Sequence, residues 1–187
     1  MTLSRALAIP SVSVRELTTL AEIQAAQRLR YTVWKSAGAV IHNPETEMIA
    51  DYHDQHASHW GVFDGNLLVA AARLCLHTNL HDAPDEQMFA GADLPVPVAS
   101  MNRLVVLETH RGLGIGGRLD RARIQKAIEW KARAVIIAPA YTLARRQSLE
   151  KLGFYFLEGV TGHAIWSPTV SICACYLILS TKENLHD

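Results

Sequence analysis

Hydrophobic and polar residues alternate in several short segments of the chain, and two longer segments repeat them at helical spacing. Alternation predicts a strand at 12–17, and apolar residues recurring every three or four positions predict a helix at 20–34. Two more strands are expected at 59–63 and 67–75, on either side of the turn signal Asp64-Gly65-Asn66. The first half therefore favours antiparallel pairing.

The second half of the chain has a different order, in which strands and helices alternate. Strands are expected at 98–107, 134–138, 154–157 and 171–180, and helices at 119–130 and 143–152. The run 134–138 is apolar throughout, which is typical of a buried parallel strand. The whole pattern predicts an α/β fold with a mixed (α+β) central sheet flanked by helices on both faces. At 187 residues, the range 1–187 is expected to form one domain.

Composition narrows the classes of partner and compartment. Lysine plus arginine and aspartate plus glutamate both number 18, so bulk charge does not indicate nucleic acid as a partner. The N-terminus lacks the apolar core of a signal peptide, and no apolar run reaches the roughly 20 residues of a membrane span. The three cysteines are expected to be reduced core thiols, which favours a cytoplasmic protein.

A glycine-rich segment, Arg111-Gly112-Leu113-Gly114-Ile115-Gly116-Gly117, joins the strand 98–107 to the following helix. Bare backbone N–H groups at a helix N-terminus bind anions, most often phosphates. A P-loop would need Lys-Ser or Lys-Thr after its last glycine, and this segment has neither. The spacing also departs from Gly-x-Gly-x-x-Gly, and antiparallel strands precede it, which disfavours a dinucleotide fold.

The segment Arg111–Gly116 matches Arg/Gln-x-x-Gly-x-Gly/Ala, the pyrophosphate signature of the GNAT superfamily of CoA-dependent N-acyltransferases. Asn102–Val106 resembles the fourth strand of that family, and Leu149–Phe154 resembles its "EKLGF" segment. The resemblance is strong from about Val98 to Phe154 and looser upstream.

This resemblance implies a GNAT-type fold and an acetyl-CoA or acyl-CoA co-substrate. Pantetheine would lie along Leu104, Val105 and Val106, and its pyrophosphate would lie on the glycine-rich segment at the positive end of the helix dipole. The segment's predicted binding residues are Arg111, Gly112, Leu113, Gly114, Ile115, Gly116 and Gly117. The implied activity is transfer of an acyl group, acetyl being the first expectation, to an amine by direct attack in a ternary complex.

The N-terminal half resembles a branch of the superfamily that contains N-acyl amino acid and acyl-homoserine-lactone synthases. The shared features are Arg30-Tyr31-Thr32-Val33-Trp34, Asp51-Tyr52-His53-Asp54, Ala72-Arg73-Leu74 and Arg103. Members of that branch draw acyl groups from acyl carrier protein, which is therefore an alternative donor. A non-catalytic acyl-CoA-binding domain is a further alternative.

The resemblance is weakest for the catalytic residues. Glu108 and His110 follow the fourth strand and are candidate bases for the attacking amine. Many GNAT enzymes place a general-acid tyrosine at the position of Leu149, and Tyr141 is the candidate substitute. The acidic and histidine residues of 51–59 match no metal-binding spacing, so no metal is expected.

The neutral chain leaves the acceptor open between a small-molecule and a peptide amine. The apolar segment 172–179 could pair at the edge of a homodimer.

Overall fold

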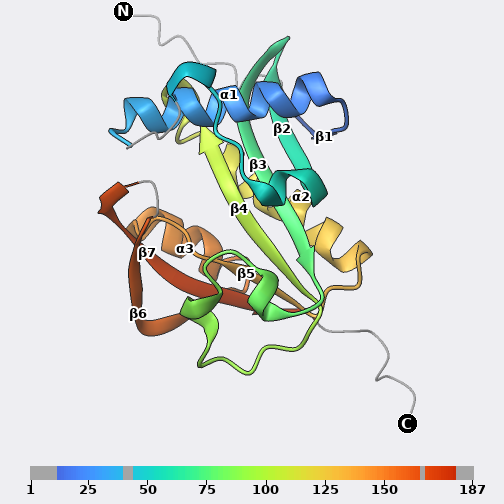
Figure 1. Ribbon diagram of the computed structural model, residues 1–187, viewed down its shortest axis with the longest axis vertical. Helices are drawn as coiled ribbons and strands as arrows, with labels where there is room; N and C mark the ends of the chain where they lie inside the picture. The colour runs from blue at the N-terminus through green and yellow to red at the C-terminus, as the bar shows by residue number, and fades with distance from the viewer. Residues whose placement is uncertain (1–11, 40–43, 165–166, 180–187) are drawn as a thin grey trace, which may run out of the picture.

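The computed structural model describes residues 12–39, 44–164 and 167–179, which form one seven-stranded mixed sheet and three α-helices (Figure 1). The strand order is β1-β2-β3-β4-β5-β7-β6, and β4 with β5 is the parallel pair. All other neighbours in this sheet are antiparallel. The predicted mixed sheet flanked by helices is confirmed.

The element bounds follow the sequence pattern closely until the last two strands. The strands are β1 (Val12–Leu17), β2 (Ser58–Asp64), β3 (Leu67–His77), β4 (Val98–Val106), β5 (Ala134–Ile137), β6 (Tyr155–Ala164) and β7 (Ser167–Ile178). The α-helices are α1 (Leu20–Ser36), α2 (Ile115–Glu129) and α3 (Leu143–Glu150). Short 3₁₀ helices are η1 (Pro44–Thr46), η2 (Tyr52–His56), η3 (Leu80–Asp82), η4 (Glu86–Phe89) and η5 (Glu108–His110).

The expectation for the C-terminal strands was partly wrong. β6 and β7 form a hairpin that is much longer than the predicted strands 154–157 and 171–180, of which residue 180 lies outside the described residues. The register of this hairpin shifts between Phe156 and Thr161, where Gly159 has a φ of +77°. Such a bulge interrupts the two-residue alternation on which strand prediction relies. Moreover, β7 lies between β5 and β6, so 172–179 is not a free sheet edge as expected.

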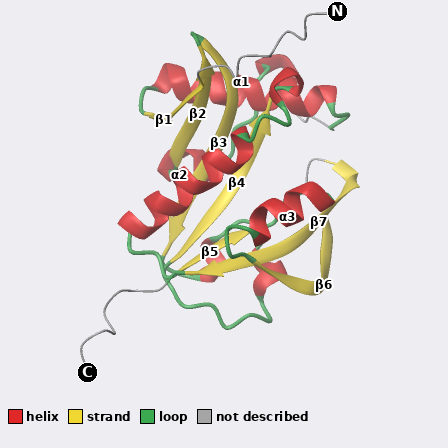
Figure 2. Ribbon diagram, turned by 180° about the vertical axis from the view of Figure 1, so that it is seen from behind, coloured by secondary structure: helices red, strands yellow, loops and turns green. Residues whose placement is uncertain are grey.

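The helices cover opposite faces of the sheet (Figure 2). α1 begins at a capping box. The Thr19 side-chain oxygen accepts a hydrogen bond from the Glu22 N–H, and the Glu22 carboxylate accepts one from the Thr19 N–H. Its apolar stripe packs on one face against Ala71 and Val105. α2 packs on the other face against residues of β2 and β3, and Leu149 of α3 joins this side of the core.

β4 separates from β5 in the middle of the sheet. The two strands pair only where Val98–Ser100 meets Ala134–Ile136, although β4 continues to Val106. On its other side β4 contains a bulge, since its register with β3 jumps between Asn102 and Val105 and Arg103 has a φ of +56°. The parallel strands therefore open just where β4 changes direction.

Candidate active site

The glycine-rich segment presents its backbone at the N-terminus of α2. Gly112 and Gly114 have φ values of +78° and +72°, and a Cβ on either would meet no atom within 4 Å. Within the described chain, the backbone N–H groups of residues 112–117 donate to no protein acceptor. Unpartnered N–H groups at the positive end of a helix dipole bind anions. The predicted pyrophosphate segment thus has the donors that such a ligand needs.

A cavity of about 680 Å³ opens between the separated strands β4 and β5. Its apolar side includes Phe89, Met101, Leu104, Ile136 and Ile172, and its polar side comes from η2, β3 and β4. Leu104 also approaches the glycine-rich segment, since a Cβ on Gly116 would lie 3.8 Å from its Cδ2 atom. The other two predicted pantetheine residues, Val105 and Val106, pair with β3 next to the cavity.

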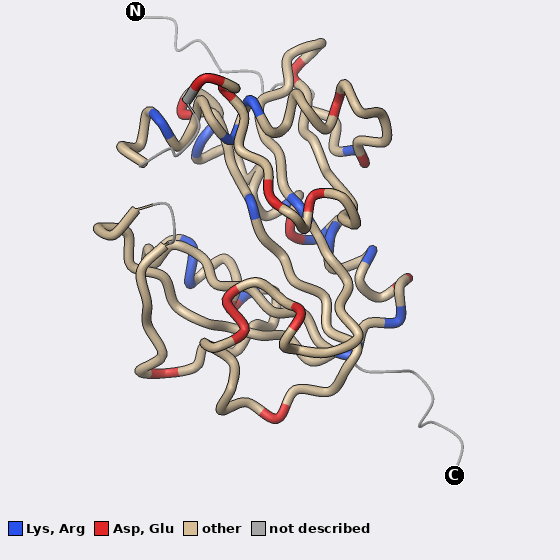
Figure 3. Tube along the Cα trace, viewed as in Figure 1, with Lys and Arg blue, Asp and Glu red and all other residues tan. Residues whose placement is uncertain are grey.

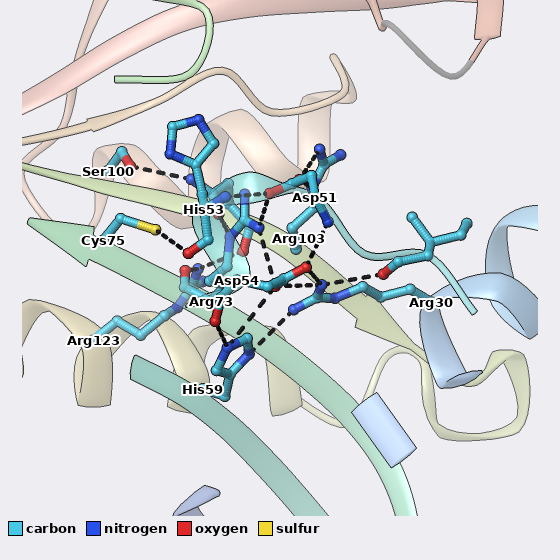
Figure 4. A network of polar contacts seen from close by, with 12 residues as sticks. Arg30, Asp51, His53, Asp54, His59, Arg73, Cys75, Ser100, Arg103 and Arg123 are labelled. Atoms are coloured by element: carbon cyan, nitrogen blue, oxygen red, sulfur yellow. Dashed lines mark hydrogen bonds and ion pairs between the residues drawn. The ribbon is translucent and has the colours of Figure 1, made fainter. Parts of the chain in front are cut away.

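Five charged side chains are linked by ion pairs on the polar side of the cavity and in the layer beneath it (Figure 4). Arg30 donates from Nη1 to Asp54 Oδ1 at 2.8 Å, and Arg73 Nη1 lies 3.0 Å from the same oxygen. Arg73 Nη1 also donates to Asp51 Oδ1 at 2.5 Å, and Arg103 Nε donates to Asp51 Oδ2 at 3.0 Å. Three guanidinium groups therefore face two carboxylates, and the cluster has one excess positive charge.

This cluster has an incomplete set of hydrogen bonds. Arg73 is fully buried, and its Nε donates to Asn102 Oδ1 at 2.5 Å. Its Nη2 has no partner in the described chain, although Arg73 lines the cavity. An unpaired buried guanidinium nitrogen has an energetic cost.

The ion pairs keep both carboxylates charged. Burial alone would raise the pKa of Asp51, but its bonds to Arg73 and Arg103 dominate and lower that pKa well below its ordinary value. Burial likewise opposes ionisation of Asp54, and Arg30 with Arg73 lowers its pKa. The cluster is therefore fully ionised at neutral pH.

A second buried network supports β4 from behind. Arg123 of α2 is fully buried and donates from Nη1 to the carbonyls of Arg73 and Asn102, at 3.1 and 3.4 Å. Its Nη2 donates to Asp120 Oδ1 at 2.7 Å, and Asp120 also accepts from Arg145. This network occupies carbonyls that lie beside the bulge, and so it holds the cavity wall in place.

The structure places the predicted catalytic residues outside the lining of the cavity. Glu108 is exposed in η5, and His110 Nε2 lies 3.3 Å from Asp64 Oδ2. Tyr141 has an exposed fraction of 52%, and its N–H donates to the Ser171 carbonyl. Leu149, at the position of the family's tyrosine, is wholly buried in the core. No described group of three or more His, Cys, Asp or Glu residues could hold a metal ion.

Several residues that line the cavity were not among the predicted site residues. Asp51, His53, Arg73, Asn102 and Arg103 entered only as parts of the family resemblance, and Ser100 was not singled out. The sequence feature that could have indicated this cluster is the pair Asp51-x-x-Asp54, which precedes Arg73 within a largely apolar strand. Charged residues at such positions require buried partners.

With strands that open and unpartnered N–H groups at the N-terminus of α2 in the described chain, this is a CoA-dependent N-acyltransferase with acyl-CoA as co-substrate. The chain belongs to the acetyltransferase (GNAT) family, whose model matches residues 20–154. No curated protein sequence gave a significant match.

Comparison with solved structures supports the same fold. The chain is similar to FeeM, an N-acyl amino acid synthase from uncultured soil microbes, with 18% identity, a TM-score of 0.67, and coverage of 90% of this chain and 91% of FeeM. A putative N-acetyltransferase from Lactobacillus plantarum has 16% identity and a TM-score of 0.62, with 90% and 99% covered. A Bacillus subtilis acetyltransferase in complex with CoA has 14% identity and a TM-score of 0.59, again with 90% and 99% covered.

Two further expectations from composition can be compared with the structure. No helix among the described residues is both long and apolar enough to cross a bilayer. Figure 3 shows basic and acidic positions interspersed over the described trace, in keeping with the balanced composition.

Proposed function

We propose that this protein transfers an acyl group from acyl-CoA to the amine of a small molecule or peptide, in a ternary complex. The observation that carries the proposal is the row of unpartnered N–H groups at 112–117, next to the opening between β4 and β5. The CoA pyrophosphate would accept hydrogen bonds from this row, with Arg111 beside it. Pantetheine would extend past Leu104 into the cavity and carry the thioester to its polar side.

The amine would attack the thioester carbonyl from the polar side of the cavity. The C–N bond forms, the C–S bond breaks, and the sulfur leaves as a thiolate, whose ordinary pKa near 8.5 makes it a fair leaving group. The attacking nitrogen must lose one proton in this step, so a base on the polar side is required.

Isothermal titration calorimetry with CoA, acetyl-CoA and dodecanoyl-CoA tests the donor. We expect all three compounds to bind. The proposal is refuted if none of them gives a heat of binding. Gly114→Asp should abolish binding because it places a carboxylate in the anion site. Gly159→Asp is the matched control, since Gly159 also has a positive φ, +77°, and open space at its Cβ position. The control should bind as the wild type does.

A second candidate function is favoured by the size and charge of the cavity. The cavity of about 680 Å³ has a mainly apolar side that suits an acyl chain, and Arg73 and Arg103 on its polar side suit an acceptor that carries a carboxylate. An N-acyl amino acid synthase, which the similar FeeM is, needs an apolar site for the acyl chain and a cationic site for the carboxylate of the amino acid. Acyl carrier protein would then be an alternative donor.

Donor length separates the two candidates. If the apolar side holds the chain, dodecanoyl-CoA should bind at least about tenfold more tightly than acetyl-CoA, because each buried methylene contributes roughly 0.8 kcal/mol. Equal affinity for the two donors would support the acetyltransferase.

The three cysteines, all free and buried, support the proposed cytoplasmic location.

A further inference from the structure

His53 of η2 lines both the acyl-transfer cavity and a neighbouring groove, as Tyr52 does, and it takes no part in the ion pairs. Figure 4 shows its ring turned away from the cluster formed by Asp51, Asp54 and the arginines. Within the described chain, neither ring nitrogen of His53 has a hydrogen-bond partner. A half-buried imidazole that faces a substrate cavity with free nitrogens is available for proton transfer.

The position of His53 is held by its backbone. Its N–H donates to Asp51 Oδ1 at 3.0 Å, and its carbonyl accepts from the Cys75 thiol at 3.9 Å. One residue later, Asp54 is anchored by Arg30 and accepts from the Asp51 N–H at 2.9 Å. The ion-pair cluster thus fixes the short helix from which the His53 ring projects.

Resting on the function proposed above, we propose that His53 is the general base that takes the proton from the attacking amine. As the C–N bond forms and the C–S bond breaks, one proton on nitrogen passes to a ring nitrogen of His53. His53 then returns that proton to the departing thiolate, which leaves an amide, a thiol and a neutral imidazole. The step needs no reactant beyond the thioester and the amine.

The surroundings keep His53 in the unprotonated form that a base requires. Burial is the main cause that lowers its pKa below 6.5, and the positive charge of Arg73 adds to this effect. The charged and titratable groups around it are Asp51, Tyr52, Asp54 and His56 from its own segment, Arg73, Cys75 and His77 from β3, Arg103 from β4, Asp82 across the groove and Asp85 across the cavity.

The adjacent imidazole does not compete for the proton. His77 lies edge-on to His53, with ring centroids 5.8 Å apart, and its Nε2 is 2.8 Å from Ser100 Oγ. Burial, followed by the proximity of His53, lowers the pKa of His77 to about 4. His77 is therefore uncharged at neutral pH and engaged with Ser100, so His53 is the imidazole of this pair that is available to the amine.

The first test follows the Cε1–H NMR resonance of His53 in the wild type, assigned by its disappearance in His53→Gln. We expect this resonance to titrate below pH 6.5 and to shift when dodecanoyl-CoA is added, because the acyl group enters the same cavity. A pKa at or above 6.5, or a resonance unaffected by bound acyl-CoA, would overturn the assignment. Absence of acyl-CoA binding would instead contradict the proposed function.

The second test measures transfer to a panel of α-amino acids and primary amines. His53→Gln should lower kcat by about 10²-fold or more, with the Kd for acyl-CoA unchanged. The wild-type kcat/KM should fall as the pH drops through the pKa of His53, and the variant should lose this acidic limb. His56→Gln, an exposed histidine of the same helix, is the control and should match the wild type. If the His53→Gln enzyme keeps the wild-type kcat, or keeps the acidic limb of the kcat/KM profile, His53 is not the general base.

Discussion

Replacing Asp54 with asparagine should strongly destabilise the protein, because Asp54 holds two buried arginines. Its Oδ1 accepts from Arg30 at 2.8 Å and lies 3.0 Å from Arg73, and its Oδ2 accepts from Arg30 and from the Asp51 N–H. Each carboxylate oxygen therefore faces at least two donors. In either orientation of an asparagine side chain, its NH₂ group would face a donor and could not accept the hydrogen bond that the carboxylate oxygen accepts. The net positive charge of the cluster would also rise by one.

The expected cost follows from the burial of the partners. Arg30 and Arg73 both have an exposed fraction of 0%, and removing one partner of a buried ion pair costs about 3–5 kcal/mol. With a urea m-value of roughly 2 kcal/mol per molar, the unfolding midpoint should fall by about 2 M. Urea unfolding followed by circular dichroism at pH 7 measures this shift. Glu158→Gln, which breaks the exposed ion pair with Arg146, is the control and should change the midpoint little.

A drop in the midpoint for Asp54→Asn no larger than that for Glu158→Gln would refute the reasoning. The pH dependence gives a second check, since the folded-state pKa of Asp54 lies below its unfolded value of 3.8. A lowered carboxyl pKa contributes stability that is present above pH 3.8 and is lost as the pH falls through the folded pKa. Asp54→Asn should therefore reduce the loss of stability on acidification below pH 3.8.

Three further predictions address the site and the scaffold. Arg103→Gln should raise the KM for carboxylate-bearing acceptors about tenfold, with the Kd for acetyl-CoA unchanged; a rise in that Kd would place Arg103 with the donor. Glu108→Gln, His110→Gln and Tyr141→Phe should each keep kcat within about threefold, since none lines the cavity, and a loss of about 10²-fold would assign that residue to catalysis. Thr19→Ala should cost about 1 kcal/mol in urea unfolding by removing the helix cap, and an unchanged midpoint would contradict that role.

The sheet was largely predictable because most of its strands show a simple periodicity. β1, α1 and β5 follow from alternation, a helical stripe and a continuous apolar run, and these patterns report which faces are buried. The hairpin of β6 and β7 was not predictable in the same way. Its bulge and its exposed positions break the alternation, and its long strands depend on pairing between distant residues.

The donor side of the site was more predictable than the acceptor side. The glycine-rich segment is continuous in sequence, so its backbone freedom and its place before α2 could be inferred directly. The acceptor side combines His53, Arg73 and Asn102 from three separate segments. Only the antiparallel register of β3 with β4 and the ion pairs of η2 bring them together, and a single sequence shows neither.

The most direct test of the central claim is a ¹H–¹⁵N NMR titration of the backbone amides with acetyl-CoA. The largest shifts are expected at residues 112–117, whose N–H groups have no acceptor within the part of the chain that the structure describes. Smaller shifts are expected at Leu104 and its neighbours in β4. Binding that leaves the amides of 112–117 unchanged would show that the pyrophosphate lies elsewhere and would contradict the account.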